Sequence, residues 1–175
     1  MAVMKSNKTN RDENRGDMEM KNFTAYDFRM ESKEYDVYTL LKLISDGTVR
    51  LDESSSTWSA TYRSHYIESI LLGVQLSDVC IDKVTEKHLV VVDGNERLLA
   101  IKKYVDGDFA LENLVIYEED FKGFTFDKLP IYARRKFYNT VIEVRYIYSS
   151  TTDHVRKIIY KDNQVTSYAL VELHD

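Results

Sequence analysis

The side chains best placed for chemistry lie in one short stretch, Asp93-Gly94-Asn95-Glu96-Arg97. Residues 89–92 before it are apolar, which is typical of a buried strand. From Asn95 onward apolar residues recur at helical spacing, so the strand should turn directly into a helix. The free N–H groups and the dipole at a helix start favour an anion. With the Glu96 carboxylate and the Arg97 guanidinium beside it, this turn suits a phosphate and its metal ion.

A purely structural interpretation of the same turn is also open. Asp93 would then cap the helix through its side chain. Glu96 and Arg97 would point into solvent and take no part in binding. Local chemistry alone favours this structural interpretation over the binding site.

Other residues carry weaker signals. The four histidines show no zinc-ligand spacing with the carboxylates or with the single cysteine, Cys80. The run Arg134-Arg135-Lys136 lies among aromatic residues, a combination that can contact nucleic acid. Such a run is also typical of a solvated helix face.

The bulk composition describes a globular protein. The chain has 175 residues and a net charge of −5, which argues against a protein that coats nucleic acid through its overall charge. It contains no apolar run of membrane-spanning length and no signal peptide, so we expect a cytoplasmic protein without a membrane partner. Residues 1–33 are polar and charged, which predicts a flexible N-terminal arm. Residues 34–175 should form one domain.

The predicted elements alternate irregularly. Strands are short and helices are interspersed among them, which predicts an α+β domain with a small mixed sheet flanked by helices. The expected helices are 34–47, 59–72, a segment from 95, one beginning at Leu129-Pro130, 153–160 and 165–173. The expected strands are 48–51, 78–81, 88–92, 109–111, 114–117, 124–127 and 141–148.

Four separated segments resemble one family in order and spacing. The pattern is similar to the N-terminal DGQQR-motif domain of GmrSD-type modification-dependent restriction proteins, within the ParB/sulfiredoxin-like superfamily. The resemblance covers about residues 35–173. The segments that carry it are 58–73, with Trp58 and Glu68-Ser69, 92–98, with the Asp-Gly-Asn-Glu-Arg turn, 121–130, and 155–163. Residues 38–51 also resemble the family's leading helix and the strand after it.

The resemblance implies a domain that binds and hydrolyses a nucleotide in DNA defence against phage. The expected cofactor is an NTP with Mg²⁺, held at the Asp93–Arg97 turn. In this scheme Asp93, Glu96 and Arg97 are catalytic, and Glu96 places the metal ion. The phosphate-binding candidates are Gly94, Asn95, Arg97, Arg63 and Ser69, and the candidates for nucleic acid are Arg134, Arg135 and Lys136.

The chain departs from the family pattern where the site needs charge. The family carries a Gln-Arg pair shortly before its tryptophan, and this sequence has Ser54-Ser55-Ser56 there. It also ends where the family continues into a His-Asn-His nuclease domain. One hypothesis is therefore a reduced restriction-type domain that binds a nucleotide or a nucleic-acid phosphate, with weak hydrolysis or support of a separate nuclease partner. The alternative is a degenerate, non-catalytic module that regulates or decoys a defence system through protein–protein binding.

Overall fold

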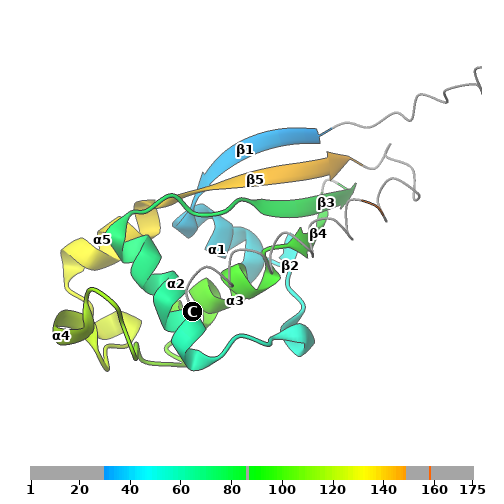
Figure 1. Cartoon of the computed structure of the whole chain (residues 1–175). Coiled ribbons are helices and arrows are strands. Elements are labelled where there is room, and N and C mark those ends of the chain that lie inside the picture. The colour runs from blue at the N-terminus through cyan, green and yellow to red at the C-terminus, as the bar shows by residue number, and fades with distance from the viewer. Residues whose placement is uncertain (1–29, 86, 149–157, 159–175) are drawn as a thin grey trace, which may run out of the picture.

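The computed structural model describes residues 30–85, 87–148 and 158, and in this part of the chain helices cover one face of a five-stranded sheet (Figure 1). The strands are β1 (Met30–Asp36), β2 (Val49–Arg50), β3 (Val79–Thr85), β4 (His88–Asp93) and β5 (Val141–Tyr148). The helices are α1 (Val37–Ser45), α2 (Ala60–Leu72), α3 (Asn95–Val105), α4 (Glu118–Phe121) and α5 (Ile131–Asn139). Two short 3-10 turns, η1 (Glu53–Ser55) and η2 (Phe126–Lys128), lie in the connections.

The sheet is mixed. Its order is β1-β5-β3-β4-β2; β1 with β5 and β3 with β4 are antiparallel, whereas β3 with β5 and β2 with β4 are parallel. This confirms the predicted α+β class with a small mixed sheet and flanking helices.

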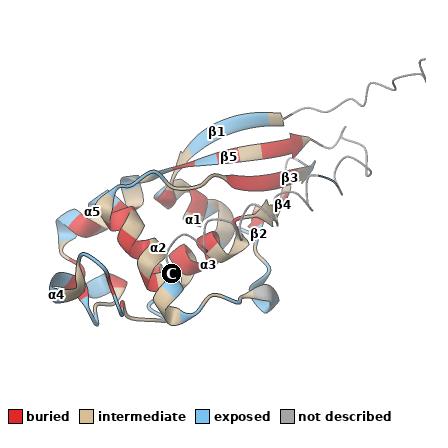
Figure 2. Ribbon diagram, viewed as in Figure 1, coloured by how far each residue is buried: buried red, intermediate tan, exposed pale blue. Residues whose placement is uncertain are grey.

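The core lies between the sheet and its helices, where buried residues gather (Figure 2). At the start of β5, Val141 and Glu143 are exposed and alternate with the buried Ile142 and Val144, as in a strand with one covered face. Tyr104 of α3 is fully buried and its ring contacts the rings of Phe126 and Phe137. This aromatic packing fixes the C-terminal turn of α3 against η2 and α5.

Two helix boundaries follow the predicted chemistry. Asp36 caps α1 by accepting the Thr39 N–H at 2.7 Å, and Gly73 ends α2 in the left-handed region with φ +79°. The turn at Asp93-Gly94 and the helix after Pro130 also lie where the sequence predicts them. Among the described residues, no helix is both long and apolar enough to cross a membrane.

Several predicted elements differ from the structure. The arm was predicted to end at residue 33, but residues 30–33 belong to β1, which pairs with β5. Residues 109–111 and 114–117 form irregular loops rather than strands, and Phe126 starts a 3-10 turn instead of continuing a strand. Strand β3 extends to Thr85, beyond its predicted end at 81. The helices predicted at 153–160 and 165–173 lie outside the described residues, apart from Ile158.

Candidate functional site

The predicted strand–turn–helix forms at the junction of β4 and α3. Gly94 joins the two elements with a left-handed backbone, φ +90°, and precedes the first residue of α3. The predicted capping role of Asp93 was wrong, because within the described residues no side chain caps this helix. The backbone N–H groups of Glu96 and Arg97 find no acceptor in the described part of the chain. Among the described residues, nothing occupies these two donors, which are of the kind that an anion would use.

Glycine is required at position 94 for two reasons. A side chain is strained at this φ, and a Cβ would lie 2.9 Å from Cγ2 of Val79. We expect Gly94→Ala to lower the free energy of unfolding by at least about 2 kcal/mol. Gly107→Ala is the matched control, since Gly107 has φ +83° but open space around it. It should cost only about 1 kcal/mol in the same urea titration, and equal costs would contradict a role for the contact with Val79.

Arg97 folds beneath the turn instead of facing solvent. Its guanidinium donates to Asp93 Oδ2 at 2.7 Å and to the backbone carbonyl of Asp78 at 2.6 Å. Arg97 as a whole is 8% exposed, so the structural interpretation that placed it in solvent was wrong. The pair ties the start of α3 to the end of β4 and to the residue that precedes β3.

Glu96 and Asn95 hold the loop that precedes Trp58. The Glu96 carboxylate accepts the Thr57 N–H and the Ser56 hydroxyl, the latter at 3.2 Å. The Asn95 side chain accepts the Asp52 N–H at 2.9 Å and donates to the Asp52 carbonyl at 2.8 Å. The loop of residues 52–57, called the serine loop below, thus lies against the Asp-Gly-Asn-Glu-Arg turn.

Trp58, which follows the serine loop, packs against Tyr66 of α2. Their rings meet edge to face with centroids 5.6 Å apart. The Tyr66 hydroxyl is buried and has no hydrogen-bond partner in the described part of the chain. Burial raises the pKa of Tyr66 from 10.0 to about 12, and the positive charge of Arg97 opposes this rise.

Tyr66→Phe should therefore change stability at neutral pH by less than about 1 kcal/mol, because it removes an unpartnered buried hydroxyl. Since the folded-state pKa is raised, the unfolded chain ionises first as the pH increases. The stability of the wild type should fall between pH 10 and about 12, and it should fall less in the variant. Urea titrations across this range measure the difference, and identical alkaline slopes would show that Tyr66 does not titrate there.

The other predicted phosphate contacts have different partners. Arg63 stacks its guanidinium over the Phe109 ring at 5.2 Å. The Ser69 hydroxyl donates to the His65 carbonyl one turn earlier in α2, at 2.9 Å. Neither of these contacts involves the turn after β4.

The basic run lies on α5. Lys136 donates to the Leu72 carbonyl at 2.9 Å and so joins α5 to the end of α2. Arg135 is exposed and Arg134 is half-buried. Lys136 is exposed like Arg135, but its ammonium group has this structural contact.

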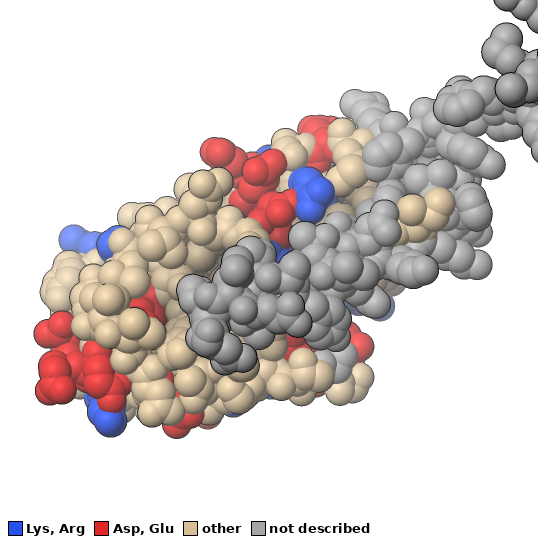
Figure 3. Space-filling view, in the orientation of Figure 1, with Lys and Arg blue, Asp and Glu red and all other residues tan. Residues whose placement is uncertain are grey.

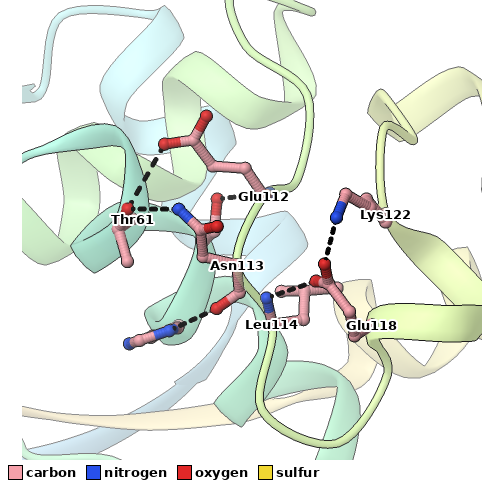
Figure 4. A network of polar contacts seen from close by, with 8 residues as sticks. Thr61, Glu112, Asn113, Leu114, Glu118 and Lys122 are labelled. Carbon is pink, nitrogen blue, oxygen red and sulfur yellow. Dashed lines mark hydrogen bonds and ion pairs between the residues drawn. The ribbon is translucent and has the colours of Figure 1, made fainter.

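A polar network that the sequence analysis missed joins α2 to the loop before α4 (Figure 4). Glu68 is 3% exposed, and its carboxylate accepts three successive backbone N–H groups, those of Val115, Ile116 and Tyr117, at 2.8–3.0 Å. Glu68 therefore belongs to the buried part of α2 and not to its solvated face. The sequence held one sign of this polar face, because Ser64 and Glu68 are four residues apart and therefore lie on the same side of α2. In the structure Ser64 accepts the Glu112 N–H.

The described residues offer no group of three or more histidine, cysteine, aspartate or glutamate side chains that could hold a metal ion. At the Asp93–Arg97 turn, Glu96 was the residue predicted to place Mg²⁺. Its carboxylate oxygens contact Ser56 and Thr57 instead. A metal ion at this position would have to replace those contacts.

No family model matches the chain, and the searches of curated proteins and of solved structures gave no match either. The resemblance to the ParB/sulfiredoxin-like superfamily therefore stays a prediction that depends on the sequence motifs.

Proposed function

We propose that the chain is a non-catalytic domain of the ParB/sulfiredoxin-like, restriction-related type that binds a protein partner and so regulates or decoys a DNA-defence system in the cytoplasm. One observation carries the proposal: all three polar side chains of the first turn of α3 are bonded within the chain. Arg97 holds Asp93 and the Asp78 carbonyl, Glu96 holds the serine loop, and Asn95 holds Asp52. In a hydrolase, polar side chains at this position would have to be available to contact the substrate.

The free energy of the Arg97–Asp93 ion pair supports the non-catalytic function. Breaking a buried ion pair costs roughly 3–5 kcal/mol, because the carboxylate left behind has no counter-charge. A phosphate would have to supply that energy to recruit Arg97 from Asp93. Among the described residues, the carboxylates of Asp93 and Glu96 also belong to this turn, so an anion bound there would meet their negative charge.

A second candidate function is the binding of a nucleotide or nucleic-acid phosphate, with Mg²⁺ and weak hydrolysis. The observation that favours it is the uncapped start of α3, where the N–H groups of Glu96 and Arg97 lack acceptors in the described part of the chain. In this scheme a phosphate would accept those two N–H groups, and Glu96 would leave Thr57 to place the metal ion.

Thermal unfolding with each of the four nucleoside triphosphates and Mg²⁺ separates the two functions. A ligand that binds the native state raises the melting temperature. For the protein-binding domain we expect a shift below about 1 °C with every nucleotide at millimolar concentration. A larger rise that disappears in Arg97→Lys, in samples with unchanged near-UV circular dichroism, would overturn the proposal in favour of the phosphate site. Lys102→Ala is the control, because Lys102 is a cation of the same helix that pairs with Asp106.

A further inference from the structure

The loop before α4 presents two neighbouring apolar side chains to solvent. Val115 is 71% exposed and Ile116 is 62% exposed. Single exposed apolar residues are common, whereas an adjacent pair on an ordered loop offers two anchor points for a partner. Their backbone is the part of the loop that Glu68 holds from below.

This loop is ordered by contacts on both sides of the apolar pair. On the N-terminal side, the His65 ring lies 2.6 Å from the Asn113 carbonyl, and the Asn113 side chain donates to the Thr61 hydroxyl at 3.0 Å (Figure 4). On the C-terminal side, Glu118 accepts the Leu114 N–H at 2.7 Å. A partner that binds here would pay little entropy to order the loop, which is the advantage of a preformed surface.

Acidic residues flank the apolar pair in the sequence. Glu112, Glu119 and Asp120 are exposed, and Figure 3 shows a cluster of acidic atoms at the end of the molecule where α4 lies. Glu118 pairs with Lys122, the one cation between residues 112 and 122. The surface thus combines apolar anchors with excess negative charge.

We infer that residues 112–122 are the docking surface for a basic segment of the protein partner, one whose apolar side chains pack on Val115 and Ile116 while its lysines and arginines face the carboxylates. The inference rests on the proposed protein-binding function and specifies the partner's chemistry. Charge complementarity selects this occupant. Nucleic acid and anionic membranes are repelled, and a symmetric contact with a second copy would bring the acidic flanks together.

The test uses a synthetic amphipathic peptide of lysine and leucine at helical spacing, followed by fluorescence anisotropy at low and raised salt. Val115→Ser/Ile116→Ser should weaken binding roughly tenfold or more, as expected for anchor residues. Glu119→Lys/Asp120→Lys should weaken it similarly and reduce its salt dependence. The matched controls are Val74→Ser, a change at a residue that is 50% exposed, and Glu53→Lys, whose side chain is 67% exposed. Both should change affinity less than about twofold.

Two results would overturn the inference. Peptide affinity that is the same in all four variants, or the same for a peptide of scrambled order, would show nonspecific attraction to an acidic protein. A dimer in sedimentation that dissociates in Val115→Ser/Ile116→Ser would assign the surface to a second copy. Both results leave the proposed function standing, because only the nucleotide-dependent rise in melting temperature contradicts that.

Discussion

Arg97→Ala is expected to lower the free energy of unfolding by about 3–5 kcal/mol. The substitution leaves the Asp93 carboxylate, whose side chain is 13% exposed, without its counter-charge at 2.7 Å. It also leaves the Asp78 carbonyl without the donor at 2.6 Å. For a domain of this size the loss corresponds to a fall in melting temperature of roughly 10 °C or more, measured by calorimetry.

Lys102→Ala is the control for Arg97→Ala. Lys102 also pairs at 2.7 Å with an aspartate four residues away, but its side chain is 34% exposed, and that of Asp106 is 46% exposed. Such a surface pair contributes at most about 1 kcal/mol. In the double variant Asp93→Ala/Arg97→Ala the loss should be smaller than the sum of the two single losses, because no charge remains buried alone. Near wild-type stability of Arg97→Ala would show that the guanidinium is kept for a ligand instead.

The strand–turn–helix at Gly94 was predictable because its signals are local. The apolar run of β4, the glycine that accepts a positive φ and the helical spacing of Leu98 and Ile101 lie within a few residues of each other. The same holds for the Asp36 cap of α1. Each of these signals acts through the chain's own backbone, so one sequence is enough to read it.

The partners of the turn's charged groups were not predictable, since they come from distant segments. Arg97 reaches a carbonyl 19 residues earlier, and Glu96 binds an N–H 39 residues earlier. Which side chain meets which carbonyl depends on how β3 and the serine loop pack around α3. Local chemistry predicts that a charge is present at the helix start but does not tell whether it faces a ligand or the chain.

The loop residues 114–117, which were predicted to form a strand, show a related limit of prediction from sequence. Residues 114–117 are mostly apolar, which is typical of a strand, yet their N–H groups bond to the carboxylates of Glu68 and Glu118 rather than to a neighbouring strand. Strand β1 shows the reverse. Its sequence is highly charged, but it pairs with β5 more than 100 residues later, and the Tyr35 and Tyr146 hydroxyls meet across the pair at 2.9 Å. In both cases the partners of the backbone N–H groups decide the structure, and Glu68 and β5 are partners far away in sequence.

Glu68→Gln is expected to lower the free energy of unfolding by about 2–3 kcal/mol, although it changes one oxygen to an amide nitrogen. Three N–H groups converge on the Glu68 carboxylate, and hydrogen bonds to an ionised acceptor are the stronger kind. The amide keeps one accepting oxygen and turns an NH₂ group toward at least one of these donors. We also expect the amides of Val115, Ile116 and Tyr117 to exchange with deuterium roughly tenfold faster or more.

Glu112→Gln makes the same chemical change on the same loop and provides the control. Its side chain is exposed and contacts the Thr61 hydroxyl at 3.3 Å, so stability should change by less than about 0.5 kcal/mol. Unaltered exchange in Glu68→Gln would mean that the Asn113 and Glu118 contacts order the loop without the buried carboxylate. Because Glu68 is only 3% exposed, a basic peptide on Val115 and Ile116 would have little access to it. A loss of peptide affinity in Glu68→Gln, with Glu112→Gln unchanged, would therefore report that docking depends on the rigidity of the loop.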